Sequence, residues 1–247
     1  MALLLLASFA LAGTFAYEGL SGDVEVWAPR DAARVPHGLL VVLHADDATP
    51  THATRRARLR RVARRRDLIL VAPTSPGPAD SGCWWSPHKQ RRAAYLAALL
   101  EDLVFAPYGA VRTRVYLAGK SGGAFWAAGV PFYGELGFSG GVVGVCGGDV
   151  PRLDSDTDWC AFTETEDDPP ITNPAPTPGW TAYFAHTAGD PWADATAAAV
   201  ELYRASGVPT LHVVTGPGGH CALDAVSWMV RGVDALSAAS SGARERR

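Results

Sequence analysis

The feature that most constrains this 247-residue chain is a short apolar run that leads directly into a glycine-rich turn. Residues 115–118 have strand-forming side chains, and residues 119–123 (Gly-Lys-Ser-Gly-Gly) match the pattern G-x-S-x-G. Residues 124–130 are apolar and mostly small, as expected of a helix packed on a sheet. A strand–turn–helix of this kind strains the backbone of the serine, so only small residues fit two positions on either side. The sequence therefore predicts that Ser121 stands at the tip of a tight turn above a sheet edge.

Segments typical of strands alternate with segments typical of helices along the chain. This alternation predicts a single α/β domain over residues 17–247, with a mostly parallel central sheet and helices on both faces. Residues 23–28 alternate polar and apolar side chains, which is typical of an edge strand with one exposed face. The other predicted strands are 39–44, 67–72, 138–146, 181–186 and 210–215, and the predicted helices are 55–66, 89–104, 193–205 and 223–236.

The N-terminal residues 1–12 are all apolar or small. They resemble the core of a signal peptide spanning residues 1–16, with small-residue cleavage sites near Ala12 or Ala16. An apolar first strand, or a start codon assigned too far into the gene, would also explain them. The run is too short to span a bilayer, so we expect no stable membrane insertion. We expect export to a secreted or periplasmic location.

Four cysteines fit an oxidising compartment in which two disulfides form. Cys146 and Cys160 flank a loop-like segment, which favours a disulfide between these two and leaves Cys83 to pair with Cys221. Spacing alone does not fix the connectivity. The cysteines contain no C-x-x-C pair, and we expect no metal site.

Two charged segments each allow a functional and a simpler interpretation. The arginine-rich residues 55–66 suggest a patch for a polyanion or a membrane surface, but Leu59, Val62 and Ala63 have helical spacing, and we favour a solvated helix face. Residues 147–179 form an acidic, proline-rich insert that is typical of a functional lid or a disordered loop, without the spacing of a calcium-binding loop. The net charge of -3 gives no reason to expect nucleic acid as a partner.

A serine hydroxyl needs an imidazole to accept its proton and a carboxylate to orient that imidazole. Asp190 follows the predicted strand 181–186, and His220 follows the predicted strand 210–215. The carboxyl ends of parallel strands meet at one edge of a sheet, so we expect both side chains near Ser121. The chain order serine, aspartate, histidine is that of α/β-hydrolases. Ser121 is therefore the predicted nucleophile, His220 the general base and Asp190 the orienting acid.

Other titratable residues are weaker candidates for these roles. Asp194 is the alternative acid, but it lies at the start of a predicted helix, where it would act as a cap. The remaining candidate histidines are His186 and His212 within strands, His52 and His88 in loops, and His44, which ends a central strand and is expected to shape the site.

A tetrahedral oxyanion requires hydrogen-bond donors. One is expected to be the N–H of Gly122, and the other an N–H from the loop after the central strand, at Ala45 or Asp46. The carboxylates of Asp46 and Asp47 would be unfavourable beside an oxyanion unless they point away.

Three tryptophans lie in segments that flank the predicted site. Together with His44, the side chains of Trp84, Trp85 and Trp192 are expected to contact substrate in an acyl or aromatic pocket. Ordinary packing would explain the tryptophans equally well.

Three stretches of the sequence also resemble a known family. They are Val-Val-Leu-His at 41–44, the proline-rich segment that ends in Gly-Cys-Trp-Trp at 82–85, and Arg-Val-Tyr-Leu-Ala-Gly-Lys-Ser-Gly-Gly at 114–123. From about residue 22 onward the chain is similar to the secreted α/β-hydrolase esterases that include polyhydroxybutyrate depolymerases and feruloyl and acetyl-xylan esterases. The resemblance implies an α/β-hydrolase fold and a serine esterase. The chain departs from the family at Ala45, where a glycine usually follows the histidine, and at Lys120.

These observations predict a serine esterase that forms an acyl-enzyme with a small-molecule or polymeric ester, such as a polyester or a plant-cell-wall ester, and needs no cofactor. One alternative is a hydrolase-fold binding protein without catalytic activity, suggested by Asp46 and Asp47. Another is a peptidase or thioesterase with the same three residues, because leaving-group preference depends on pocket shape. The sequence indicates no oligomeric state.

Overall fold

One eight-stranded sheet organises the computed structural model, which describes residues 9–46, 57–77, 84, 89–134, 136–148 and 176–244. Across the sheet the order is β1-β2-β4-β3-β5-β6-β7-β8. The pairs β1/β2 and β2/β4 are antiparallel, and all the others are parallel, which confirms the predicted mostly parallel sheet. The strands are β1 (Phe9–Tyr17), β2 (Leu20–Ala28), β3 (Gly38–Leu43), β4 (Leu68–Pro73), β5 (Val115–Lys120), β6 (Gly140–Val145), β7 (Thr181–Thr187) and β8 (Thr210–Thr215).

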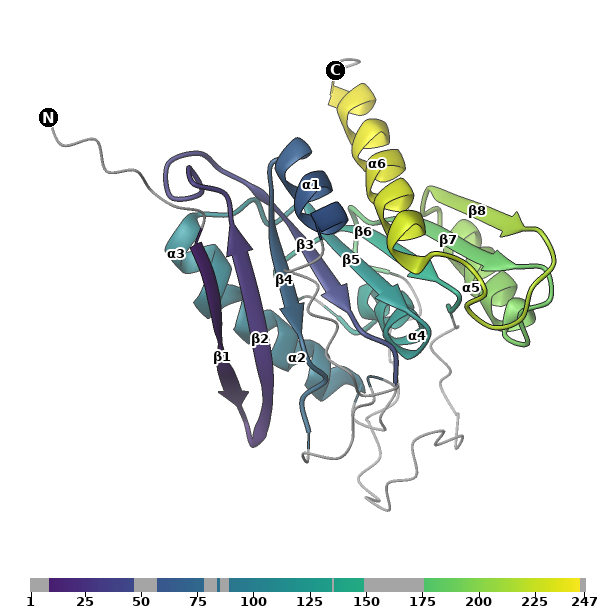
Figure 1. Cartoon of the computed structure of the whole chain (residues 1–247), viewed down its shortest axis with the longest axis horizontal. Helices are drawn as coiled ribbons and strands as arrows, with labels where there is room; N and C mark the ends of the chain where they lie inside the picture. The colour runs from purple at the N-terminus through teal and green to yellow at the C-terminus, as the bar shows by residue number, and fades with distance from the viewer. Residues whose placement is uncertain are drawn as a thin grey trace, which may run out of the picture.

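Helices cover both faces of the sheet (Figure 1). In front lie α1 (Ala57–Arg65) and α6 (Ala225–Arg244), and behind lie α2 (Lys89–Leu100), α4 (Gly122–Gly129) and α5 (Ala193–Ala205). Each face has its own apolar core, one centred on α2, α4 and α5 and the other on α1 and α6. Because both faces are covered, every residue of β3 and β4 is buried, as their continuous apolar sequences predict.

The helix predicted over residues 89–104 changes geometry near its end. After α2, a π-helical turn (Glu101–Phe105) and the short α3 (Ala106–Tyr108) complete it. Gly109 then adopts a left-handed conformation with φ of 60°, which is the usual way for a helix to stop. A short 3-10 helix, Val130–Phe132, directly follows α4.

The N-terminal hairpin corrects one prediction. Residues 23–28 belong to β2, which is not an edge strand in this structure, because β1 pairs with it from Phe9↔Ala28 to Tyr17↔Leu20. Glu18 and Gly19 both have positive φ, as a two-residue turn between twisted strands requires. An apolar first strand was one of the alternatives for this segment. Cleavage near Ala12 or Ala16 would remove part or most of β1, and the signal peptide stays a prediction.

The hairpin is anchored to α2 through Tyr95. The Tyr95 ring packs edge-on against Phe15, with ring centroids 5.4 Å apart, and its hydroxyl lies 3.3 Å from the Phe15 carbonyl oxygen. Burial raises the pKa of Tyr95 to about 12, so the hydroxyl remains a neutral donor at physiological pH.

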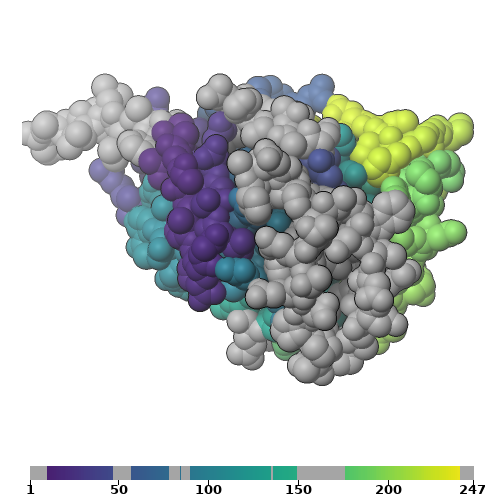
Figure 2. Space-filling view, turned by 90° about the horizontal axis from the view of Figure 1, so that it is seen from below, coloured from purple at the N-terminus to yellow at the C-terminus, as the bar shows by residue number. Residues whose placement is uncertain are grey.

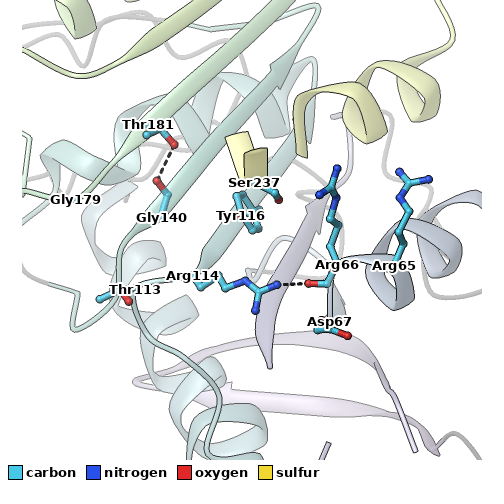
Figure 3. A pocket seen from close by; sticks show the side chains of 10 residues that line it. All are labelled: Arg65, Arg66, Asp67, Thr113, Arg114, Tyr116, Gly140, Gly179, Thr181 and Ser237. Carbon is cyan, nitrogen blue, oxygen red and sulfur yellow. Dashed lines mark hydrogen bonds between the residues drawn. The ribbon is translucent and has the colours of Figure 1, made fainter. Parts of the chain in front are cut away.

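Arginines of α1, Arg66 just after it and Arg114 just before β5 tie the helix to α6 and β5. Its buried residues are the predicted Leu59, Val62 and Ala63. Asp234 of α6 pairs with both Arg65 and Arg66, and the Arg66 carbonyl accepts a hydrogen bond from Arg114, the residue before β5 (Figure 3). Arg58 likewise pairs with Asp224. These contacts give several of the arginines a structural role.

The two ends of the sheet lie at opposite sides of the molecule. In Figure 2 the hairpin β1–β2 (purple) lies on one side and the C-terminal segments (green and yellow) on the other. Within the described part of the chain, no helix has the length and apolar character needed to cross a bilayer.

The double ion pair of Asp234 should contribute more stability than an isolated surface pair. We expect Asp234→Asn to lower the free energy of unfolding by about 0.5–1 kcal/mol, because all three side chains are partly exposed and solvent screens them. The matched control is Glu201→Gln, which breaks a single exposed pair with Arg204 and should change stability by less than about 0.5 kcal/mol. Urea denaturation measures both, and equal effects would contradict the structural role given to Asp234.

Candidate active site

Ser121 lies in a strained turn between β5 and α4. Its backbone has φ 50° and ψ -122°, a region that non-glycine residues rarely adopt. The turn is held by hydrogen bonds from the Ser121 N–H to the Val145 carbonyl (3.0 Å) and from the Phe125 N–H to the Ser121 carbonyl (2.9 Å). The strand, turn and helix therefore occur where the G-x-S-x-G pattern predicts them.

The glycines of this turn are required by close backbone contacts. A Cβ on Gly119 would collide with the backbone of Gly123, and a Cβ on Gly123 would collide with the carbonyl oxygen of His44. The turn is thus pressed against the end of β3. This contact brings the loop that follows β3 to the serine.

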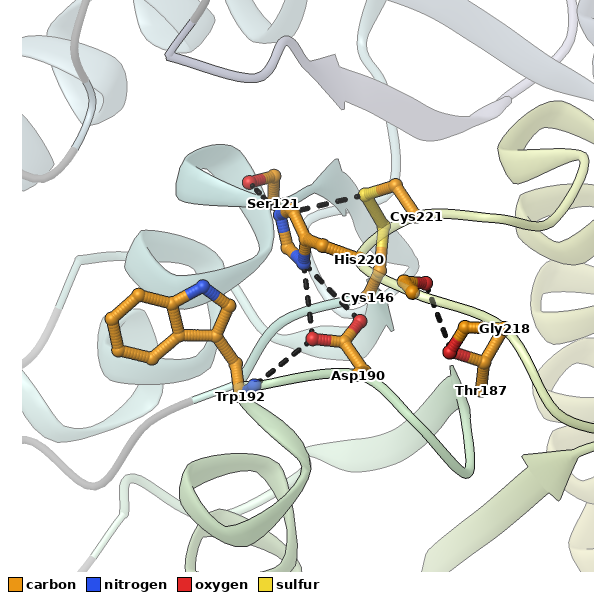
Figure 4. Close-up of a disulfide and its surroundings, with 9 residues drawn as sticks. Ser121, Cys146, Thr187, Asp190, Trp192, Gly218, His220 and Cys221 are labelled. Atoms are coloured by element: carbon orange, nitrogen blue, oxygen red, sulfur yellow. Dashed lines mark hydrogen bonds and ion pairs between the residues drawn. A yellow bond between two sulfur atoms is a disulfide. The ribbon is translucent and has the colours of Figure 1, made fainter.

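The structure brings Ser121, His220 and Asp190 together from three different strand ends (Figure 4). The His220 Nε2 lies 2.8 Å from the Ser121 Oγ, and its Nδ1 lies 3.0 and 3.2 Å from the two carboxylate oxygens of Asp190. An ionised carboxylate only accepts hydrogen bonds, so Nδ1 carries the proton and Nε2 is the acceptor for the serine hydroxyl. The arrangement can take a proton from Ser121 and stabilise the resulting imidazolium.

The position of Asp190 is fixed by burial and by a backbone hydrogen bond, independently of its contact with His220. Its side chain is 1% exposed, and its Oδ1 accepts a 3.0 Å hydrogen bond from the Trp192 N–H. The alternative acid Asp194 lies in the first turn of α5, and the carboxylate that contacts His220 is that of Asp190.

His44 is buried at the end of β3 and contacts backbone on both sides of its ring. Its Nδ1 donates to the Ala45 carbonyl at 2.6 Å, and its Nε2 accepts from the Ser75 N–H at 2.9 Å. This pattern fixes the ring as a support for the loop after β3, where Ala45 is also buried.

The carboxylate of Asp46 lies directly against Gly122. A Cβ on Gly122 would overlap both carboxylate oxygens, so they sit beside the start of α4. The Asp46 Oδ1 accepts a hydrogen bond from the Trp84 N–H at 3.2 Å. This side chain therefore does not point away from the start of α4, as a favourable oxyanion site was expected to require. The positive end of the helix dipole attracts the carboxylate, which explains its position.

The tryptophans have different environments. Trp84 is completely buried and packs against Trp126 and His44, with ring centroids 5.0 and 5.6 Å away, which is the packing role left open by the sequence. Trp192 is partly buried beside the Ser121, His220 and Asp190 group, and its ring meets Phe125 edge-on at 5.6 Å. Trp85, His52, His88 and Asp47 lie outside the described residues.

Phe125 was missed by the sequence analysis. It lies four residues after Ser121 on α4, one helical turn further along the helix, and the i,i+4 spacing from the serine could have pointed to it.

The two strand histidines form a separate pair. The Nε2 atoms of His186 and His212 are 2.9 Å apart, and the His186 Nδ1 donates to the Thr187 carbonyl. Burial and, secondarily, the neighbouring His186 lower the pKa of His212, which favours the neutral form of its ring. Among the described residues no group of three or more histidine, cysteine, aspartate or glutamate side chains is arranged to hold a metal ion.

The predicted disulfide pairing is wrong. Cys146 is bonded to Cys221, with 5.2 Å between their Cα atoms, instead of to Cys160. Cys146 directly follows β6 and Cys221 lies in the loop after β8, so both are at the carboxyl edge of the parallel sheet despite a separation of 75 residues. The partners proposed for them, Cys160 and Cys83, lie outside the described residues.

A cavity of about 330 Å³ lies at the opposite end of the strands (Figure 3). Its arginines have structural partners: Arg114 binds the Arg66 carbonyl, and Arg65 and Arg66 pair with Asp234. The cavity is remote from Ser121, and its charges are explained by the packing of α1. Its lining residues are Arg65, Arg66, Asp67, Thr113, Arg114, Tyr116, Gly140, Gly179, Thr181 and Ser237.

Comparison with known proteins identifies the fold. No protein-family model matches the sequence, and no curated protein matches it. Among solved structures, an arylesterase is similar with a TM-score of 0.68 and 15% identity over 93% of this chain and 85% of that protein. A ferulic acid esterase has a TM-score of 0.65 and 15% identity over 94% and 97%. The S-formylglutathione hydrolase of Staphylococcus aureus has a TM-score of 0.61 and 15% identity over 96% and 100%. The chain therefore has the predicted α/β-hydrolase fold.

The close contact beneath the serine turn gives a stability prediction. Gly123→Ala should lower the free energy of unfolding by about 1–3 kcal/mol, because the added methyl group collides with the His44 carbonyl. In an unhindered helix the same change would stabilise by about 0.5–1 kcal/mol. Gly13→Ala on β1 is the control, since nothing lies within 4 Å of its Cβ position. A neutral or stabilising Gly123→Ala in urea denaturation would contradict the contact.

Proposed function

We propose that this protein is a serine esterase that uses Ser121, His220 and Asp190 as a catalytic triad. The observation that carries the proposal is the continuous hydrogen-bonded path from the Ser121 Oγ through both nitrogens of His220 to a buried carboxylate. As the Oγ attacks the ester carbonyl carbon, its proton moves to the His220 Nε2, and Asp190 stabilises the imidazolium. The tetrahedral intermediate then expels the alcohol, which takes that proton, and leaves an acyl group on Ser121.

Water completes the cycle by the same path. His220 removes a proton from the water as its oxygen attacks the acyl carbon, and the proton returns to the Ser121 oxygen when the carboxylic acid departs. All bonds are made and broken by proton and acyl transfer, so the proposed cycle requires no cofactor.

The proposed hydrogen-bond donors to the oxyanion are the N–H of Gly122 and a backbone N–H of the loop at Ala45. Gly122 is the first residue of α4, whose positive dipole end faces the turn. Ala45 belongs to the loop after β3. It is buried, and its carbonyl accepts a hydrogen bond from His44, which supports a fixed position for this loop.

The substrate is proposed to be an ester whose acyl or aromatic part contacts Trp192 and Phe125. These two rings pack edge-on against each other, and Trp192 lies beside the proposed triad in Figure 4, so the pair offers an apolar wall. Proteins of this fold include an arylesterase, a ferulic acid esterase and an S-formylglutathione hydrolase, so the fold is compatible with several acyl and leaving groups. A polyester, a plant-cell-wall ester or a thioester are the classes to assay first. A peptide substrate belongs in the same panel.

Export to an oxidising compartment is part of the proposal. The disulfide between Cys146 and Cys221 is supported in such a compartment, and the apolar N-terminal residues 1–16 supply the predicted leader.

A second candidate function is binding without catalysis, and the position of Asp46 favours it. A carboxylate against Gly122 opposes the negative charge that develops on the substrate carbonyl oxygen. A fluorophosphonate probe separates the two functions: labelling of Ser121 supports the enzyme, whereas well-folded protein that is not labelled supports the binding protein.

Removing the nucleophile tests the esterase directly. Ser121→Ala should lower kcat on p-nitrophenyl acetate and butyrate by at least about 10³-fold, since the triad acts as a unit. Ser21→Ala, which changes an exposed serine of β2 in the N-terminal hairpin, should retain full activity. Undiminished hydrolysis by Ser121→Ala would sink the proposal.

Neutralising Asp46 should increase the rate if the protein is an esterase. Asp46→Asn keeps an acceptor for the Trp84 N–H and removes the charge beside the oxyanion. Unit charges about 4 Å apart interact by about 1 kcal/mol in water and about 4 kcal/mol at an effective dielectric constant of 20. Because Asp46 is exposed, we expect roughly 1–2 kcal/mol, or a rise in kcat of about 5- to 30-fold.

Salt provides the control for this electrostatic effect. The advantage of Asp46→Asn over the wild type should shrink as ionic strength rises, because salt screens an exposed charge. Asp102→Asn, an exposed acid on the π-helical turn after α2, should leave kcat unchanged. A fall in kcat for Asp46→Asn, or an advantage that does not depend on salt, would show that Asp46 acts in another way.

A further inference from the structure

His220 is carried by an irregular loop between β8 and α6. Its imidazole is 32% exposed, so surrounding side chains do not enclose it. The Thr187 hydroxyl lies 2.7 and 3.0 Å from the carbonyl oxygens of Gly218 and Gly219 and shares its one proton between them, and the Ala222 N–H donates to the Gly219 carbonyl. Thr187 is buried, so these bonds fix Gly218 and Gly219, but none of them is made by His220 or Cys221.

The next residue, Cys221, supplies a covalent anchor through its disulfide with Cys146 (Figure 4). Cys146 is completely buried, and its N–H donates to the Ala185 carbonyl at 2.8 Å, so the anchor point belongs to the sheet. The disulfide therefore joins the loop that carries His220 to the end of β6 in the sheet.

The same strand end also holds the nucleophile. The Ser121 N–H donates to the carbonyl of Val145, the residue before Cys146. One short path thus joins the two reacting side chains: from Ser121 by a backbone hydrogen bond to Val145, along the chain to Cys146, and through the disulfide to Cys221 and His220. The distance between the Ser121 Oγ and the His220 Nε2 depends on this path and on Asp190.

The disulfide contacts the imidazole as well as its backbone. The Sγ of Cys221 lies 3.7 Å from the His220 Nε2, on the side of the ring away from Asp190 in Figure 4. Both half-cystines have positive φ, 48° at Cys146 and 52° at Cys221. This conformation is unfavourable for L-residues and persists only where surrounding contacts stabilise it. Without the bond, relaxation at Cys221 would turn the adjoining His220 backbone and remove the sulfur from beside the ring.

We infer that the Cys146–Cys221 disulfide is a positioning element for His220, which keeps its Nε2 within hydrogen-bonding distance of the Ser121 Oγ. The inference rests on the proposed esterase function. Its consequence is that breaking the bond slows the chemical step while substrate binding remains. A displacement of the base by about 1 Å costs on the order of 10²-fold in rate. A disulfide that only stabilised the fold would change the melting temperature and leave the kcat of the folded protein intact.

The first test is the double variant Cys146→Ala/Cys221→Ala, assayed on p-nitrophenyl butyrate at a temperature at which circular dichroism shows it to be folded. We expect kcat to fall by about 10- to 100-fold with KM changed by less than about twofold. The matched control is Val233→Ala, which removes a buried core contact under α6 without touching the site. It should melt at a lower temperature and keep its kcat.

A second measurement uses the wild-type protein and does not depend on the folding of a variant. Dithiothreitol reduces the disulfide to two thiols and is itself oxidised to its cyclic disulfide. At each stage of reduction, iodoacetamide and peptide mass spectrometry give the fraction of free Cys221. Activity should fall in proportion to that fraction, with KM unchanged, and should return when the bond is reoxidised.

The outcomes separate this inference from the proposed function. If wild-type protein neither hydrolyses esters nor reacts with a fluorophosphonate, the proposed function fails, and the inference fails with it. If the wild type is active and the double variant or the reduced protein keeps the full kcat, the inference alone is overturned. A loss that appears only in KM would overturn it as well, because the disulfide would then act on substrate binding.

Discussion

The close backbone contact between the serine turn and the end of β3 is the constraint on which the rest of the site depends. Gly119 and Gly123 permit it, because a side chain at either position would collide with neighbouring backbone. The contact sets the strained conformation of Ser121 and aligns α4 with the loop after β3. The parallel strands then bring the other two side chains of the candidate site to the same edge, Asp190 after β7 and His220 after β8. The site is therefore a consequence of where the strands end.

Two electrostatic influences oppose each other at this edge. The start of α4 favours a negative charge beside Gly122, which suits an oxyanion. In the resting structure the Asp46 carboxylate lies there. The esterase proposal requires the oxyanion to form next to this charge, and the cost is moderate because Asp46 is exposed to solvent. An active enzyme and an inactive binding protein of the same fold would differ in whether the attraction of α4 for the oxyanion exceeds its repulsion by Asp46.

Local patterns in the sequence predicted the features that depend on neighbouring residues. The G-x-S-x-G turn, the buried face of α1 and the bounds of α5 follow from spacing that a single element determines. The convergence of Ser121, Asp190 and His220 was also predictable, because parallel strands align their carboxyl ends. Features that depend on contacts across the sheet were not predictable. The disulfide between Cys146 and Cys221 crosses β7, and the edge position of β1 depends on its pairing with β2. Arg65 of α1 pairs with Asp234 of α6, which lies far away in the sequence.

The proposed mechanism requires that Ser121 carries the acyl group during turnover. The most direct measurement mixes the wild-type protein with p-nitrophenyl butyrate, quenches the reaction in acid within a fraction of one turnover, and maps the digested protein by mass spectrometry. One butyryl group is expected on the peptide that contains Ser121, and it should be lost at the rate at which butyrate is released. Hydrolysis that proceeds with a butyryl group on another residue, or with no adduct under conditions in which release of p-nitrophenol shows a burst, would contradict it.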